Sequence, residues 1–325
     1  MHSLALDPRL EAELDDVLRQ CGALHPYEVA WELEGWGFAL PDPLLRAAFL
    51  QVWTPTRIAK CSTEEVDAIL GTIGIEGAIE AVMGERGTSA WAVSDQWKKA
   101  LARPVNAHEN MVLGLVACAH WARFRADEPS DEMLYDRLVA GELLASQKQW
   151  GAACDCFKVF WDSVAGRLPK NLRRATGATG LFRGVLLEAW AERYCLTLVR
   201  ASSDWPDYMD TGLAFIDAYL LQFPATGGTA GWMLHATKGR FQLQSGRAQE
   251  GFTRFEALIR EDPTSPAGFR ALADAVLACA EPPLAIVKKT VALLIAATHR
   301  RVDASGAWEL SKCVQQLNTV AASID

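Results

Sequence analysis

The sequence lacks a long apolar run, an excess of basic residues and a secretory leader, and each absence argues against a class of protein. No apolar run approaches the roughly 20 residues that an α-helix needs to cross a bilayer, although half of the 325 residues are hydrophobic. The net charge is −8, so the chain lacks the basic balance of a typical nucleic-acid-binding protein. Residues 1–7 carry no positive segment followed by an apolar stretch, so we expect neither a signal peptide nor a transit peptide.

The eight cysteines form no recognisable framework. Cys154 and Cys156 are the one close pair, and a single residue between two ligands is not a zinc-finger spacing. No second pair or histidine cluster completes a metal site. We therefore expect reduced, unpaired cysteines in a cytoplasmic protein, and no bound metal.

Alternating, β-branched patterns typical of strands are also absent, whereas helical patterns occur throughout. Asp7-Pro8 and Asp42-Pro43 each place an N-cap residue before a proline at the first helical position. Ser62 and Glu65 have the spacing of a capping box, which predicts a helix running to about Gly84. The fold class that we expect is all-α.

A short polar stretch, 126–131, separates two regions. We expect an N-terminal helical region over 1–127, with helices near 91–103 and 108–126, and a second region over 128–325. The period of the apolar residues and the turn signals predict further helices in the second region, near 131–146, 151–166, 182–202, 207–222, 230–245, 248–261, 265–280, 283–299 and 304–323.

A spacing of glycine, large apolar residue and proline occurs twice in this second region. In each copy the intervals are the same, with Gly212, Ile216 and Pro224 in one and Gly251, Phe255 and Pro263 in the other. The upstream part of the pattern occurs once more, at Gly141, Ala153 and Phe157. Gly141 precedes Ala153 by the interval that separates Gly239 from Gly251, and Phe157 follows Ala153 as Phe255 follows Gly251. Small, small, aromatic and proline residues at these offsets resemble the tetratricopeptide repeat, a helix–turn–helix unit that stacks into a solenoid.

The resemblance covers about residues 130–300 and implies an α-solenoid of stacked helical hairpins, a TPR-like superhelix that follows an additional N-terminal helical region. It also implies that Gly239, Gly251 and Phe255 meet at one helix–helix contact. The scaffold hosts many unrelated tasks, so the resemblance indicates a fold more than a function.

The clearest repeat unit runs from Trp232 to Ser265, and its first helix departs from the family pattern. Positions that are apolar or aromatic in the family are occupied here by His235, Lys238 and Gln242. Leu234 and Phe241 each lie one residue away from such a position. The register of this helix is therefore left open by the sequence.

A basic stretch is the main candidate for partner binding. It comprises Arg167, Lys170, Arg173, Arg174 and Arg183. Guanidinium groups match carboxylates and phosphates, so the stretch suits an acidic peptide, a C-terminal carboxylate or a phosphate. The alternative is a solvated loop or a set of ion pairs within the chain.

The three N-terminal tryptophans, Trp31, Trp36 and Trp53, are a secondary candidate, because aromatic residues are enriched at interfaces. The alternative is that they fill space between helices. Most of the twelve tryptophans are expected in the core.

Motifs for chemistry and for nucleic-acid binding are missing. The glycines at 177–184 precede no Gly-Lys-Ser or Gly-Lys-Thr, as a phosphate-binding loop would require. Residues 65–84 weakly resemble a helix-turn-helix, but Glu76 and Glu80 would repel DNA phosphates. We therefore assign no catalytic, cofactor-binding or metal residues.

The sequence favours a protein–protein interaction scaffold or adaptor that binds a partner protein or peptide, one with an acidic segment in particular. The alternative is a regulatory subunit or a ligand or peptide sensor whose solenoid changes shape on binding. An enzyme on an all-helical scaffold is a third hypothesis. No cofactor, membrane contact or direct nucleic-acid contact is expected.

Overall fold

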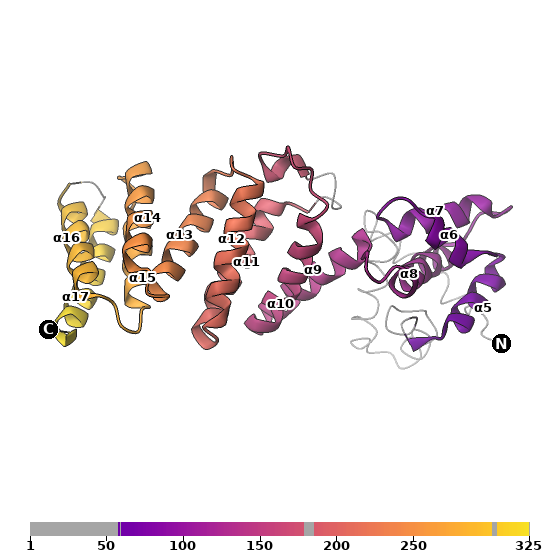
Figure 1. The fold of residues 1–325 in the computed structure, drawn as a ribbon, viewed down its shortest axis with the longest axis horizontal. Coiled ribbons are helices and arrows are strands. Elements are labelled where there is room, and N and C mark those ends of the chain that lie inside the picture. The colour runs from indigo at the N-terminus through magenta and orange to yellow at the C-terminus, as the bar shows by residue number, and fades with distance from the viewer. Residues whose placement is uncertain (1–57, 59, 179–184, 301–303, 325) are drawn as a thin grey trace. The chain divides into compact units, whose positions relative to one another are not determined.

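The computed structural model describes residues 58, 60–178, 185–300 and 304–324. Over these ranges the chain forms thirteen α-helices, one short 3-10 helix and no strand (Figure 1), which confirms the all-α class. The helices are α5 (Thr63–Ile73), α6 (Ala78–Gly84), α7 (Ala90–Ala100), α8 (Ala107–Phe124), α9 (Asp131–Ser146), α10 (Trp150–Ala165), α11 (Leu187–Asp204), α12 (Asp207–Gln222), α13 (Gly228–Gln244), α14 (Ala248–Glu261), α15 (Pro266–Leu277), α16 (Leu284–Arg300) and α17 (Ala304–Ile324), with the 3-10 helix η1 at Ala175–Ala178.

The predicted capping box is confirmed, but the helix that it starts is shorter than predicted. Ser62 Oγ accepts a hydrogen bond from Glu65 N at 3.2 Å, and Ser62 N donates to the Glu65 carboxylate at 2.7 Å. The single helix expected over 62–84 is wrong: α5 ends at Ile73 with Gly74 as its C-cap, and α6 begins after Gly77. These glycines have φ of 97° and 66°, left-handed conformations that most other residues avoid.

The chain divides into two compact units, 1–136 and 137–325. In the described part of the first unit, α5, α6 and α7 all pack on α8. Met111, Val116 and Trp121 of α8 are almost fully buried. The domain boundary predicted at 127/128 stays a prediction.

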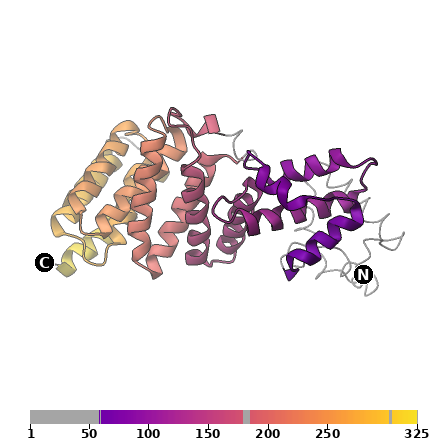
Figure 2. The same ribbon diagram turned by 45° about the vertical axis from the view of Figure 1, so that its right-hand side comes forward.

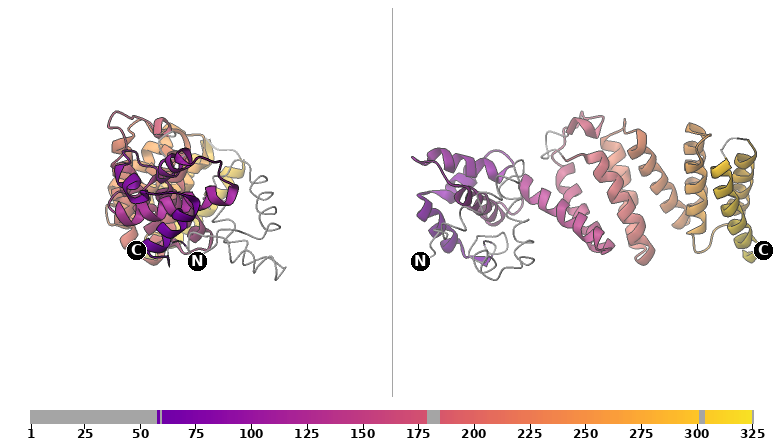
Figure 3. Two further views of the ribbon diagram at one scale, coloured as in Figure 1. Left: turned by 90° about the vertical axis from the view of Figure 1, so that its right-hand side faces the viewer. Right: turned by 180° about the vertical axis from the view of Figure 1, so that it is seen from behind.

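The second unit has an alternating pattern of helix contacts. Each helix from α10 to α16 packs on the next helix in the chain. In addition, α11 packs on α13, α13 on α15, and α15 on α17. In Figures 2 and 3 the helices from α10 to α17 follow one another side by side, from magenta to yellow. The helices from α10 to α17 therefore find their main partners close by in the sequence.

A cluster of aromatic rings joins α10, α11 and α12. Trp190 of α11 lies 5.9 Å from Trp161 and 5.5 Å from Phe215, measured between ring centroids. Tyr194 lies 4.6 Å from Phe215, and Tyr219 lies 5.5 Å from Trp161. Large rings thus fill the space between these helices, and the expectation that most tryptophans lie in the core is confirmed for the described ones.

Gly239, Gly251 and Phe255 meet at one contact between α13 and α14, as the repeat resemblance implies. A Cβ atom on Gly239 would lie 2.9 Å from Phe255 Cε2. A Cβ atom on Gly251 would lie 2.5 Å from the Gly239 carbonyl oxygen and 2.8 Å from Leu243 Cγ. Both glycines are therefore needed for the two helices to approach this closely.

We predict that Gly251→Leu destabilises the second unit by about 1–3 kcal/mol, because its side chain overpacks the contact between α13 and α14. The melting temperature measured by differential scanning calorimetry should fall. Gly166→Ala is the control, since a Cβ atom there meets nothing within 4 Å. A Gly251→Leu protein that melts like the wild type would contradict the packing assignment.

Cys154, Cys156, Cys195, Cys279 and Cys313 are free thiols. Cys154 and Cys195 are buried, and burial raises the pKa of each thiol to about 12. Cys156 is half-buried. Because the thiolate is the reactive form, Cys154 and Cys195 should be inert in the folded protein.

We predict that iodoacetamide at pH 8 labels Cys156 faster than Cys154 or Cys195, and that all three react once the protein is unfolded. Peptide mass mapping of native and urea-treated samples measures the difference. Equal labelling rates in the native sample, or an intact disulfide in the non-reduced protein, would show that these thiols are not held as described.

Candidate functional site

The open register of α13 is resolved by which of its residues are buried. Leu234 and Phe241 are fully buried. The Phe241 ring lies against Gly212 of α12, so closely that a Cβ atom on Gly212 would be 2.4 Å from Phe241 Cε2. The buried apolar residues of α13 therefore lie one residue away from the positions that the repeat resemblance predicts.

The displacement leaves His235, Lys238 and Gln242 on a neighbouring face of α13, at positions i, i+3 and i+7. His235 and Lys238 are half-buried, and Gln242 is buried. Residues that occupy apolar positions of the repeat family thus form a polar row beside the core.

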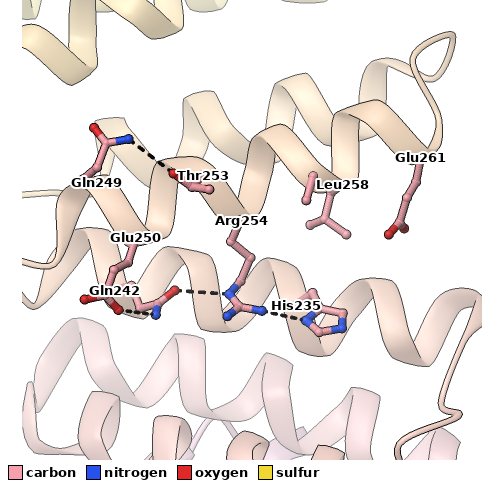
Figure 4. Close-up of a pocket in the computed structure, with 9 residues that line it drawn as sticks. His235, Gln242, Gln249, Glu250, Thr253, Arg254, Leu258 and Glu261 are labelled. Carbon is pink, nitrogen blue, oxygen red and sulfur yellow. Dashed lines mark hydrogen bonds between the residues drawn. The ribbon is translucent and has the colours of Figure 1, made fainter.

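This polar row borders a groove of about 520 Å³ between α13 and α14. Figure 4 shows the side chains that line it. The lining consists of His235 and Gln242 from α13 and of Gln249, Glu250, Thr253, Arg254, Ala257, Leu258 and Glu261 from α14.

Four of the lining side chains form one chain of hydrogen bonds (Figure 4). Arg254 Nη1 lies 2.9 Å from His235 Nδ1, and Arg254 Nε donates to Gln242 Oε1 at 3.2 Å. Gln242 Nε2 in turn donates to Glu250 Oε2 at 2.9 Å. Both polar groups of the buried Gln242 amide are therefore paired.

The contact with Arg254 determines the tautomer of His235. A guanidinium has donors and no acceptor, so His235 Nδ1 must accept the hydrogen bond. The imidazole is then neutral and carries its proton on Nε2. Burial lowers the pKa of His235, and the positive charge of Arg254 lowers it further, while Glu261 opposes the shift.

Arg254 is held in place by charges as well as by hydrogen bonds. Burial lowers the pKa of its guanidinium, and the carboxylates of Asp217 and Glu250 act in the opposite direction. Asp217 belongs to α12 and pairs with Lys238 of α13. The network therefore joins three successive helices, α12, α13 and α14.

Chemically, the groove offers both donors and acceptors at restrained positions. The guanidinium and the imidazole Nε2–H can donate, and the carboxylates of Glu250 and Glu261 can accept. Such a mixture suits the N–H and C=O groups of a bound peptide, which need both kinds of partner. It does not by itself select a strongly charged ligand of either sign.

The basic stretch lies in the loop after α10. Arg167 is half-buried, Lys170, Arg173 and Arg174 are exposed, and Arg183 lies outside the described residues. The loop is tied to the end of α12, because Gln222 Nε2 donates to the Pro169 carbonyl and Ala225 N donates to the Arg173 carbonyl, each at 3.0 Å.

Lys170, Arg173 and Arg174 are exposed to solvent. The salt bridges of the described residues involve other cations, such as Lys158 and Arg193. Within the described ranges, the alternative of ion pairs is therefore not seen for these three cations. Trp31, Trp36 and Trp53 lie outside the described residues, and the interface suggested for them stays a prediction.

Sequence reasoning did not single out Arg254, Glu250 or Gln242 as site residues. The available signal was the row of polar residues at apolar repeat positions of α13. That row indicated an anomaly in the register, but only the fold brings α14 alongside and shows that Arg254 completes the network.

Comparison with known proteins finds no matching family model, no similar curated protein and no similar solved structure. In the described part of the chain, no group of three or more His, Cys, Asp and Glu residues is placed to hold a metal ion. Among the described helices, none combines the length and apolar character needed to cross a membrane.

We predict that His235 stays neutral to a lower pH than an ordinary histidine, whose pKa is about 6.5. The unfolded chain then takes up the proton first, so this residue contributes stability above pH ~6.5 that is lost as the pH falls below that value. Two-dimensional ¹⁵N–¹H spectra of the imidazole should show the Nε2–H tautomer at pH 7.

Urea unfolding of the wild type and of His235→Gln, each at pH 7.5 and pH 5.5, tests the same assignment. The loss of stability on acidification should be smaller in the variant. A charged His235 at pH 7, or an unchanged pH dependence in the variant, would contradict the hydrogen bond from Arg254.

Proposed function

We propose that the chain is a protein–protein interaction scaffold, in which stacked helical hairpins of the tetratricopeptide kind form an α-solenoid that holds a partner protein or peptide. The alternate contacts among α11, α13, α15 and α17 support this proposal. Nearest-neighbour stacking of two-helix repeats produces contacts of this kind. No enzymatic activity and no cofactor are proposed.

The buried polar side chain of Gln242, in the groove between α13 and α14, is the observation that carries the proposal. Gln242 is 4% exposed, yet it lies where the repeat family has an apolar residue. Burying an amide has a cost even when its hydrogen bonds are made. A position with a purely structural role would be served better by an apolar side chain, and departures of this type concentrate at functional sites.

The partner that suits this groove is an extended segment. Its backbone amides would pair with the donors and acceptors that line α13 and α14, and Leu258 and Ala257 would contact its apolar side chains. The exposed cations Lys170, Arg173 and Arg174 would attract a segment rich in acidic residues and raise its association rate.

A regulatory subunit or sensor is the second candidate, and the network itself favours it. Asp217, Lys238 and Arg254 link α12, α13 and α14 through charges. A ligand that replaced one of these contacts would change how the three helices pack. A solenoid would then transmit the change along its length.

The free cysteines support a cytoplasmic location, because disulfides are rare in reducing compartments. We therefore include a cytoplasmic location in the proposal.

Site-specific photo-crosslinking tests the proposed groove. A benzophenone amino acid replaces Thr253, which lines the groove, or Gln316, which is exposed on α17. We predict that the Thr253 probe forms one discrete adduct with a partner protein in cells, and that the Gln316 probe does not.

Arg254→Gln in the Thr253 probe protein should reduce the adduct about tenfold, because a hydrogen bond to a charged group contributes about 1.5–3 kcal/mol. Equal adducts from both probe positions, or an adduct indifferent to Arg254→Gln, would overturn the groove as the partner site. A ligand-induced rise in melting temperature with no protein adduct would favour the sensor.

We also predict that Arg173→Glu together with Arg174→Glu slows association with the crosslinked partner and leaves the melting temperature nearly unchanged, since exposed charges contribute little to stability. Surface plasmon resonance at increasing salt measures the rate, and the difference from the wild type should shrink as the Debye length falls below about 8 Å. If the variant unfolds, Arg173 and Arg174 stabilise the fold and the prediction is wrong.

A further inference from the structure

Two tryptophans in the described part of the chain are more than half exposed, and they differ in what covers them. Trp205 is 52% exposed and Trp308 is 61% exposed. Lys312 Nζ lies 3.4 Å from the ring centroid of Trp308, so this indole already holds a cation from its own chain. No described cation lies over Trp205, although its surroundings are acidic.

Trp205 borders a groove of about 520 Å³ at the N-terminal ends of α10 and α12. Asp155 of α10 and Asp207 of α12 line the same groove, together with Tyr208. The lining includes two carboxylates and no basic side chain. The groove therefore combines an open aromatic face with negative charge.

The side chains of this groove are held in place by α10. The Tyr208 hydroxyl lies 3.1 Å from Asp155 Oδ1 and 3.1 Å from the Gly151 carbonyl oxygen. A Cβ atom on Gly151 would lie 3.2 Å from the Tyr208 hydroxyl oxygen and 3.5 Å from Trp205 Cζ3. Glycine at this position lets both aromatic rings lie against the helix.

Helix electrostatics account for only part of this arrangement. A carboxylate in the first turn of a helix is favourable in itself, which explains Asp207. Asp155 is beyond the first turn of α10, and the nearby Lys158 pairs with Asp162 instead, at 2.5 Å. Asp155 lies at hydrogen-bond distance from the Tyr208 hydroxyl but has no cationic partner among the described residues. Exposing the indole beside it does not stabilise the fold in an evident way.

We propose that this groove binds an arginine side chain of a partner protein, with the guanidinium over the Trp205 ring and its charge balanced by Asp155 and Asp207. Arginine fits better than lysine because its planar, weakly hydrated cation stacks on aromatic faces and pairs with carboxylates through a fork of N–H donors. This inference rests on the proposed function only in that a partner protein would carry the arginine. Binding of an arginine side chain in the groove can be tested without that partner.

The test is a ¹⁹F NMR titration of the full chain labelled with 5-fluorotryptophan. Trp205→Phe and Trp308→Phe assign the resonances of these two indoles. The probe is a blocked Gly-Ser-Arg-Ser-Gly peptide, and its citrulline analogue keeps the shape and removes the charge. Titration to about 20 mM covers dissociation constants of a few millimolar. A dissociation constant of about 1 mM corresponds to about 4 kcal/mol of binding free energy.

We expect the Trp205 resonance to shift saturably with the arginine peptide and to stay in place with the citrulline peptide. Asp155→Asn combined with Asp207→Asn should weaken the binding at least about fivefold, and Trp308 should not respond because Lys312 covers it. A stationary Trp205 resonance, an equal response to citrulline, or binding unaffected by the aspartate changes would overturn the proposal. None of these outcomes depends on the groove between α13 and α14, so the two proposals fail separately.

Discussion

Close approach of a helix backbone to an aromatic ring is the constraint on which the second unit depends. At three contacts a phenyl ring lies where the Cβ atom of any residue other than glycine would be, namely Gly141 with Phe157, Gly212 with Phe241, and Gly239 with Phe255. Each contact brings two helices to a separation that only glycine allows, and it also fixes how each helix is rotated about its axis.

The rotation of α13 leads directly to the candidate site. With Phe241 against Gly212, the polar residues His235 and Gln242 can reach only the side of α13 that borders α14. There they meet Arg254, and the hydrogen bonds that result satisfy a buried amide and a half-buried guanidinium. The contact of Phe241 with Gly212 and the hydrogen bonds of Arg254 thus both follow from the register of α13.

Much of this could be predicted from the sequence, because caps, glycines and apolar periods are local signals. The helix predicted at 207–222 matches α12, and the contact of Gly239 with Phe255 followed from the repeat spacing. The weak helix-turn-helix resemblance of residues 65–84 has Gly74 in its turn, but the prediction of one helix to about Gly84 missed this break. A left-handed glycine and a helical glycine look the same in a sequence. Arg254 and Trp205 were missed because their surroundings come from other helices, which no spacing within one helix reveals.

Proton–proton nuclear Overhauser effects within the second unit test the central claim most directly. The register described here predicts strong cross-peaks from the Gly212 Hα protons to the Phe241 ring, and from the Gly239 Hα protons to the Phe255 ring. If the Gly212 protons instead contacted the Gln242 side chain, the family register would hold, α13 would be rotated, and the polar network with Arg254 could not form.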